Sequence, residues 1–292
     1  MKHALIVLAH GNIPDLLDML GQFDDHFDAY VHLDRKAPVS AADLRELETS
    51  ARVRFLSRRY TVNWGGMNIV RAILEVSREA VKDKDLSYLH MVTGTDRIIV
   101  KPSRLRAYFE AHRGKEFMLH FVLPTRFWPN GGLDRLSHYD LLDLFDVRTE
   151  RGKKYRNLAL HFQERLGFKR SIPSDFPPLF GGSMSWSLTR ELVEYVLRKD
   201  ADDPAFMRRF AHTHCPDEIA MQTLIMNSPF APNVVNNNLR YIDWTRKKSA
   251  HPYVLDLANW DEMMASGNVL ARKIDRPFSD GLIERLRGHV QE

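Results

Sequence analysis

Short apolar runs alternate with amphipathic segments over the first hundred residues. Runs rich in aliphatic and β-branched residues predict strands, and apolar residues at helical spacing after each polar turn predict helices. The expected strands are 4–9, 30–33, 53–56 and 88–92, and the expected helices are 15–23, 41–49 and 68–81. This alternation is typical of an α/β fold with a mostly parallel central sheet and helices on both faces.

The pattern is less regular after residue 100. It predicts a strand at 115–122, helices at 134–145 and 153–166, and a helix that Thr189 caps and that runs to Leu197. The tail from 237 to 275 mixes short strands, aromatics and basic residues, and we expect it to fold back to complete a site. We interpret residues 1–292 as a single domain, with a nucleotide-binding half at 1–110 and an acceptor and catalytic half at 111–292.

Composition narrows the choice of function. The chain has 42 basic and 38 acidic side chains, so its net charge of +4 is too small to indicate nucleic-acid binding. It permits a cationic cleft for a phosphorylated ligand and peripheral contact with an anionic membrane. A single Cys excludes an internal disulfide and a Cys-based zinc site. The apolar run at 4–9 is much shorter than the roughly 20 residues that span a bilayer. We therefore expect a cytoplasmic protein.

Three polar residues follow predicted strands, where open α/β sheets bind ligands. His10, Asp34 and Asp96 each lie at such an end. Asp34 could accept hydrogen bonds from a ribose or a base edge, although a polar strand end without a role is the alternative for both acids. Neither acid belongs to an Asp-x-Asp metal motif.

Asp217 and Glu218 follow Pro216, which is suited to the first turn of a helix. We expect them on the first turn of an amphipathic helix that continues through Leu224. A carboxylate held there can serve as a general base. The alternative is that both acids only complement the helix dipole.

Positive charge in the tail could neutralise a diphosphate leaving group in place of a metal ion. The tail offers Arg246, Lys247, Lys248, Arg272 and Lys273. Trp244 and Trp260 stand among these charges, in a pattern that suits either sugar stacking or core packing. His212 and His214 could form a metal pair, but they lack a convincing third ligand, so we expect no metal cofactor.

Eight ordered segments between residues 8 and 275 resemble the core-2/I-branching β-1,6-N-acetylglucosaminyltransferase family, which includes the peptide-O-xylosyltransferases. The segments are Leu8-Ala9-His10, Val31-His32-Leu33-Asp34-Arg35-Lys36, Val62-Asn63-Trp64-Gly65-Gly66, Thr93-Gly94-Thr95-Asp96, Gly182-Ser183-Met184-Ser185-Trp186-Ser187-Leu188, Pro216-Asp217-Glu218, Leu239-Arg240-Tyr241-Ile242-Asp243-Trp244 and Ala271-Arg272-Lys273-Ile274-Asp275.

The resemblance implies a GT-A-like nucleotide-sugar-binding fold and an inverting, metal-independent transfer from a UDP-sugar, with N-acetylglucosamine as the expected sugar. The implied acceptor is a hydroxyl of a glycan or lipid-linked glycan, in cell-surface polysaccharide or lipopolysaccharide synthesis. Alternatives are UDP-xylose or another UDP-hexose as donor, and a non-catalytic nucleotide-binding or membrane-surface module. The animal enzymes carry a membrane anchor and several disulfides. This sequence shows neither feature, so we expect a bacterial cytoplasmic member of the family.

The resemblance also implies roles for individual residues. Glu218 matches the general base, Lys273 the contact to the diphosphate, Asp34 the contact to the nucleoside and Trp244 the border of the acceptor site. Two departures stand out: Arg97 and Ile98 replace an aromatic–Pro pair, and His251 stands where a second diphosphate-binding Arg is expected. The remaining expected site residues are His10, Trp64, Asp96, Arg246, Lys248 and His251 on the donor side, and Asp217 and Arg135 on the acceptor side.

Overall fold

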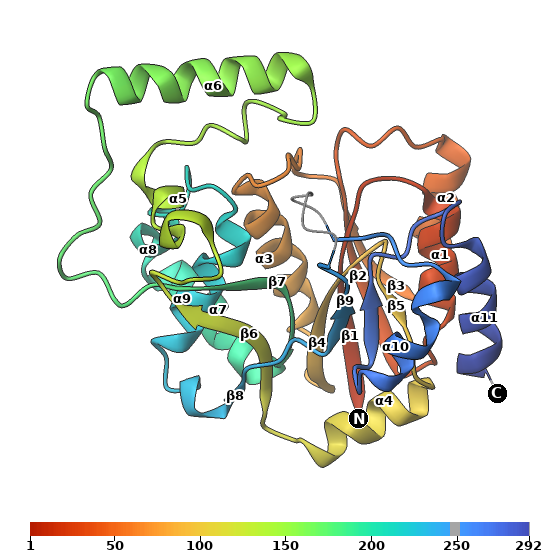
Figure 1. The fold of residues 1–292 in the computed structure, drawn as a ribbon. Coiled ribbons are helices and arrows are strands. Elements are labelled where there is room, and N and C mark those ends of the chain that lie inside the picture. The colour runs from red at the N-terminus through yellow and green to blue at the C-terminus, as the bar shows by residue number, and fades with distance from the viewer. Residues whose placement is uncertain (246–251, 292) are drawn as a thin grey trace.

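The computed structural model describes residues 1–245 and 252–291, which form a single α/β domain around a seven-stranded sheet (Figure 1). The strand order is β3-β2-β1-β4-β7-β6-β8. The strands are β1 (Lys2–Ala9), β2 (Phe27–Leu33), β3 (Val53–Ser57), β4 (Leu86–Thr93), β6 (Glu116–Val122), β7 (Phe180–Thr189) and β8 (Val234–Val235).

Most neighbouring strands of this sheet run parallel. β3, β2, β1 and β4 are parallel, β8 is parallel to β6, and β7 is antiparallel to both of its neighbours. Every residue of β2 is buried, because a parallel strand is covered on both faces. The mostly parallel sheet confirms the fold class that the alternating pattern predicts.

Helices cover both faces of the sheet. Alternate residues of β1 divide between two cores: Ile6 packs with α3, α7 and α9, whereas Val7 packs with α1, α2 and α4. The helices are α1 (Ile13–Gly21), α2 (Ala41–Thr49), α3 (Asn68–Ala80), α4 (Pro102–Ala111), α5 (Asp134–Ser137), α6 (Glu150–Arg165), α7 (Arg190–Asp202), α8 (Pro204–Arg208), α9 (Ala220–Met226), α10 (Trp260–Ala265) and α11 (Asp280–Gln291).

The tail folds back onto the first half of the chain through a second, three-stranded sheet. Its order is β5 (Arg97–Ile98), β10 (Leu270–Arg272) and β9 (Arg240–Ile242). Leu270 pairs with Ile98 on one side and with Arg240 on the other. Because of this pairing, the residues that come after β9 and β10 in the sequence lie near the carboxyl end of β4.

Several helices differ from the sequence-based expectation: α5 is shorter than expected, and α4, α8, α10 and α11 were not expected. The expected helix at 134–145 ends after Ser137, because His138 turns to an extended conformation and Asp140 faces Arg156 and His214. α4 was not expected, although Pro102 at its start and the buried pair Leu105 and Phe109, four residues apart, are helix signals.

α6 lies at the periphery, at the top of Figure 1. β1 starts at the N-terminus at the bottom of the same view, so α6 is on the side where the parallel strands end. Among the described residues, no helix is both long enough and apolar enough to cross a bilayer.

Candidate functional site

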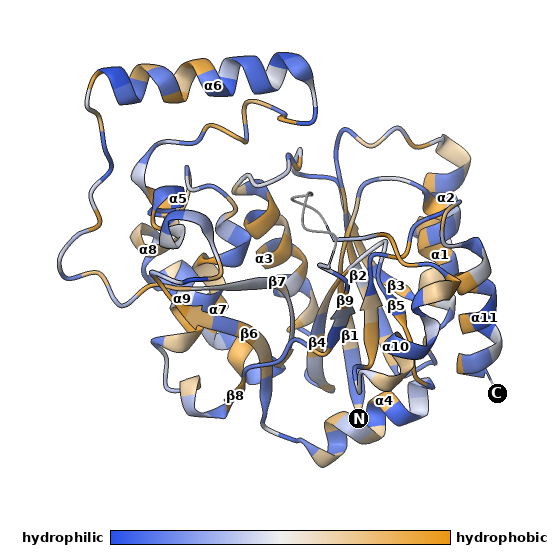
Figure 2. Cartoon of the chain, in the orientation of Figure 1, coloured by the Kyte–Doolittle hydropathy of each residue, from blue (hydrophilic) through white to orange (hydrophobic). Residues whose placement is uncertain are grey.

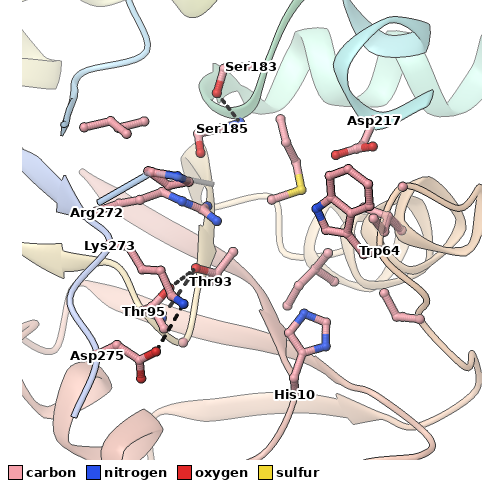
Figure 3. Close-up of a pocket in the computed structure, with 18 of the residues that line it drawn as sticks. His10, Trp64, Thr93, Thr95, Ser183, Ser185, Asp217, Arg272, Lys273 and Asp275 are labelled. Atoms are coloured by element: carbon pink, nitrogen blue, oxygen red, sulfur yellow. Dashed lines mark hydrogen bonds and ion pairs between the residues drawn. The ribbon is translucent and has the colours of Figure 1, made fainter. Parts of the chain in front are cut away.

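A cavity of about 690 Å³ lies at the carboxyl ends of β1 and β4. Its walls come from the turns after these strands, from the start of β7, from the Trp64–Gly65 segment and from the tail. Figure 3 shows Arg272 and Lys273 on one side of the space and Trp64 and Asp217 on the other. The expected site residues that line the cavity are His10, Trp64, Asp217, Glu218, Trp244 and Lys273.

Two carboxylates reach the cavity from one 3-10 turn, Pro216–Glu218. The Glu218 N–H donates to the Cys215 carbonyl, and the Ile219 N–H donates to the Pro216 carbonyl. Ile219, at φ −131°, separates this turn from α9. The expectation that the acidic pair starts the amphipathic helix is therefore wrong, because the chain makes a separate tight turn first.

The acidic turn is anchored to Gly65. The Cys215 N–H donates to the Gly65 carbonyl at 3.0 Å, and Cys215 itself has a positive φ of 52°. Gly65 has a φ of +74°, and a Cβ there would lie 3.2 Å from Cys215 Sγ. Only glycine adopts this conformation at little cost, so Trp64 and the acidic turn are held in a fixed relation.

Arg135 holds the Glu218 carboxylate. Its Nη1 donates to Glu218 Oε2 at 2.7 Å, and its guanidinium stacks 3.7 Å from the centre of the Trp128 ring. Arg135 does not itself line the cavity. We expected it to contact the acceptor, but it lies behind Glu218 and orients that carboxylate.

Asp217 differs from Glu218 in its surroundings. Its Oδ1 is buried and has no hydrogen-bond partner among the described residues. Burial, with a smaller contribution from the charge of Glu218, raises the pKa of the Asp217 carboxyl. Because Asp217 lines the cavity, its carboxyl group can hydrogen-bond a hydroxyl of a bound molecule.

The tail supplies two cations to the opposite wall. Arg272 ends β10, Lys273 follows it, and both line the cavity. Arg272 Nη1 lies 3.7 Å from Asp96 Oδ2, and Lys273 Nζ lies 3.2 Å from Asp275 Oδ2. The wall therefore presents two positive charges at the strand ends, an arrangement that can bind an anionic group.

His10 and Asp34 lie together at the ends of β1 and β2. His10 lines the cavity, and its Nδ1 is 3.5 Å from Asp34 Oδ2. Asp34 is 2% exposed, and its Oδ1 accepts the main-chain N–H groups of Val62 and Lys36. Burial alone would raise the pKa of Asp34, but these hydrogen bonds and that of His10 lower it. The structure places Asp34 just behind the lining, so its contact with a nucleoside stays a prediction.

Asp96 is also behind the wall of the cavity. It is 1% exposed, and its Oδ2 accepts the main-chain N–H of Thr93 at 2.8 Å. We expected Asp96 to contact the donor, but the structure places it beneath the Thr93–Thr95 turn and next to Arg272. It is therefore suited to position these lining residues.

Arg97, one of the two departures from the family pattern, is fully buried. Its Nη1 donates to the carbonyls of Gly94 and Asp96, and its Nη2 pairs with Asp15 Oδ1 at 2.5 Å. Arg276 Nε, from the tail, lies 3.2 Å from the same Asp15 oxygen. Arg97 thus fixes the turn after β4 to α1 and to the tail.

We expect Arg97→Leu to lower the free energy of unfolding by about 3–5 kcal/mol, because it leaves the buried Asp15 carboxylate with Arg276 as its remaining cation. Urea unfolding, followed by circular dichroism, measures the change. Arg104→Leu, at an exposed position of α4, is the matched control and should unfold like the wild type. A loss below about 1 kcal/mol for Arg97→Leu would show that the network contributes little.

Two tryptophans lie at the cavity, as the sequence led us to expect. Trp64 lines it and meets the His214 ring edge to face, with 5.5 Å between centroids. Trp244 lines it with 58% of its surface exposed, so its ring is open to a ligand. Trp260 instead packs beneath Arg285 and against His289, away from the lining.

Several lining residues were not expected from the sequence. They are Arg148 and five small or polar residues near strand ends: Asn12, Thr93, Thr95, Ser183 and Ser185. A signal was present, because the Thr93-Gly94-Thr95 turn ends a buried strand and Asn12, at φ 53°, caps α1. Hydroxyl and amide groups at strand ends are suited to binding sugar and phosphate oxygens.

Arg246, Lys248 and His251, which we assigned to the donor side, lie outside the described residues, as does Lys247. Within residues 1–245 and 252–291, no group of three or more His, Cys, Asp or Glu side chains is arranged to hold a metal ion. His214 instead bonds Asp140, with 3.1 Å between Nδ1 and Oδ2. The expected absence of a metal cofactor remains a prediction.

Comparison with known proteins identifies the family. The sequence profile of the Core-2/I-Branching enzyme family matches residues 4–262. The chain belongs to this family. Xylosyltransferase 2 of Rattus norvegicus is 27% identical over 268 residues, which are 89% of this chain and 28% of that protein; the Homo sapiens protein is 28% identical over the same shares. Xylosyltransferase 1 of Homo sapiens is 26% identical, over 89% of this chain and 26% of its own length.

This Core-2/I-Branching chain thus spans between a quarter and a third of the length of those curated relatives. Among solved structures, TarS of S. aureus aligns with 44% of this chain and 23% of its own, at 20% identity and a TM-score of 0.30. That likeness is too low for the two sites to be compared. The family match supports the family that the eight ordered segments indicate.

Proposed function

We propose that this chain is an inverting, metal-independent glycosyltransferase that moves a sugar from a UDP-sugar to a hydroxyl of a glycan acceptor. The arrangement of Glu218 carries the proposal. An ion pair with Arg135 fixes this carboxylate in a cavity whose other wall holds Arg272 and Lys273. Family membership supports the same reading.

In the proposed reaction, Glu218 removes the proton of the acceptor hydroxyl. The resulting oxygen attacks the anomeric carbon and forms the new glycosidic bond, while the bond from that carbon to the UDP oxygen breaks. The electron pair leaves with UDP, whose growing negative charge Lys273 and Arg272 stabilise. Attack from the side opposite the leaving group inverts the configuration. General-base catalysis of this kind contributes about 10²–10⁴-fold.

The donor sugar is proposed as N-acetylglucosamine, with UDP-xylose as the alternative that the names of the curated relatives favour. UDP release from a panel of UDP-N-acetylglucosamine, UDP-xylose, UDP-glucose and UDP-galactose decides between them. Release from a single member, at a rate well above that of the Glu218→Gln variant, identifies the donor. Binding without release from any donor, even with glycan acceptors, would instead support a non-catalytic nucleotide-binding module.

We expect activity to survive exhaustive chelation. The described residues offer three cations at the cavity, Arg148, Arg272 and Lys273, and no metal-ligand cluster, so side chains can stabilise the leaving diphosphate. The measurement is UDP release before and after dialysis against EDTA, with and without added Mn²⁺ or Mg²⁺. Loss of activity in EDTA and recovery with either ion would contradict metal-independent transfer.

A further inference from the structure

α6 presents apolar side chains to solvent rather than to the core. Tyr155, Leu158, Phe162 and Leu166 are 40%, 47%, 55% and 81% exposed. Their spacing of three, four and four residues places them on one side of the helix, which we call the apolar stripe. Contiguous exposed apolar residues of this kind mark an interaction surface.

A different side of α6 already packs against the domain. Arg156 pairs with the buried Asp140 at 2.5 Å, and Gln163 Nε2 donates to the Tyr139 carbonyl at 3.0 Å. Gly152 is buried, and a Cβ there would collide with the carbonyl of Asp146. The helix is therefore fixed in place, and the apolar stripe is not a core face turned outward.

Basic side chains accompany the stripe. Arg151, Lys154 and Arg165 are exposed, and none has a carboxylate partner among the residues that the structure describes. From 150 to 170 the sequence has seven Lys and Arg and two Glu. Figure 2 shows hydrophobic and strongly hydrophilic turns alternating along α6. A basic amphipathic helix with exposed aromatic and Leu residues is typical of helices that lie on anionic membranes.

A second cavity, of about 450 Å³, lies at the carboxyl end of α6. Phe168 and Lys169, just beyond the helix, line it together with Arg170, Arg208 and Arg209, and its described lining includes no carboxylate. We call it the cationic pocket. Burial lowers the pKa of Arg170 and of Arg209, and the nearby charge of Arg209 lowers that of Arg170 further. An anion bound there would offset this repulsion.

We propose that α6 and the cationic pocket dock the protein on an anionic phospholipid surface. The apolar stripe enters the boundary between headgroups and acyl chains, the exposed cations lie among the headgroups, and a lipid phosphate occupies the pocket. α6 lies on the side of the molecule where the parallel strands end, so docking turns that side, which carries the site, toward the lipid (Figure 1). The proposal does not depend on glycosyl transfer.

Co-sedimentation with vesicles, without any sugar donor, tests this docking. We expect the full chain to bind vesicles of phosphatidylcholine mixed with phosphatidylglycerol, not phosphatidylcholine alone, and to bind less in high salt. The triple variant Arg151→Gln, Lys154→Gln and Arg165→Gln should bind about a hundredfold less tightly, at about fivefold per cation. The double variant Leu158→Ser and Phe162→Ser should also lose binding, because it removes apolar area.

The matched control is Lys101→Gln, Arg104→Gln and Arg113→Gln, on and beside α4 at the opposite side of the molecule (Figure 1). It removes the same charge and should bind like the wild type. Circular dichroism melting verifies that each variant is folded. Equal binding to both vesicle types, or an equal loss in the control, overturns the proposal. The proposal is also overturned if the protein self-associates through α6. In that case the Leu158→Ser and Phe162→Ser variant would abolish self-association, and anionic vesicles would not reverse it, because a second copy of the chain would cover the helix.

Discussion

Replacing Glu218 with glutamine is expected to lower turnover by at least about a hundredfold, because the amide cannot accept the proton of the acceptor hydroxyl. The fold and the affinity for UDP should be unchanged, since glutamine has the same shape and keeps an oxygen toward Arg135. Steady-state transfer by the purified variant, together with calorimetric titration of UDP, measures both effects.

Two further variants make this result specific. Glu284→Gln, at an exposed position of α11, removes the same charge far from the cavity and should keep full turnover. Asp217→Asn changes the neighbouring carboxylate and should raise the KM for the acceptor more than it lowers kcat, since that residue is proposed to bind a hydroxyl. Near wild-type turnover of Glu218→Gln, with a hundredfold loss in Asp217→Asn, would move the base to Asp217.

Replacing Lys273 with alanine is expected to weaken UDP binding by about tenfold to a hundredfold, which is typical for the loss of a hydrogen bond to a charged group. Turnover should fall as well, because the same cation stabilises the leaving diphosphate. Uridine lacks the diphosphate, so its affinity should be unchanged. Calorimetric titration of UDP and of uridine into both proteins separates these contributions.

Lys101→Ala, at an exposed position before α4, is the matched control for the lost charge. It should bind UDP like the wild type. If Lys273→Ala also binds UDP like the wild type, Lys273 has no part in the site, and Arg272 is left as the described cation on that wall. An equal loss of UDP and uridine affinity would indicate that the substitution disturbs the cavity as a whole.

The sequence predicted the parts of the site that a local pattern determines. Strand ends are visible in the apolar runs, so the positions of His10, Asp34 and Asp96 at one edge of the sheet could be inferred. The sequence could not show which of these side chains reaches the cavity, because that depends on contacts between distant segments. Asp34 lies behind the cavity lining, where its carboxylate accepts a hydrogen bond from the main-chain N–H of Val62. Asp96 lies behind the lining too, where its carboxylate accepts one from the main-chain N–H of Thr93.

The roles of the arginines were the hardest to predict. Arg135 pairs with Glu218 across 83 positions of sequence, and Arg97 pairs with Asp15 across 82. A pattern within one segment cannot reveal such pairs, because the two partners are more than 80 positions apart in the sequence. Likewise, Pro216 in the sequence indicated the start of a helix. The sequence did not show that the Gly65 carbonyl would accept the Cys215 N–H and hold a separate turn there.

The second sheet has a consequence for the growing chain. β5, near residue 97, has no partner in that sheet until β10 has been synthesised; Arg272 is the last residue of β10, and Lys273 is the next residue. A nascent chain that stops before β10 already contains His10, Trp64 and the acidic turn but lacks both tail cations of the cavity wall. Translation must therefore pass residue 273 before the wall of the cavity can carry these two cations.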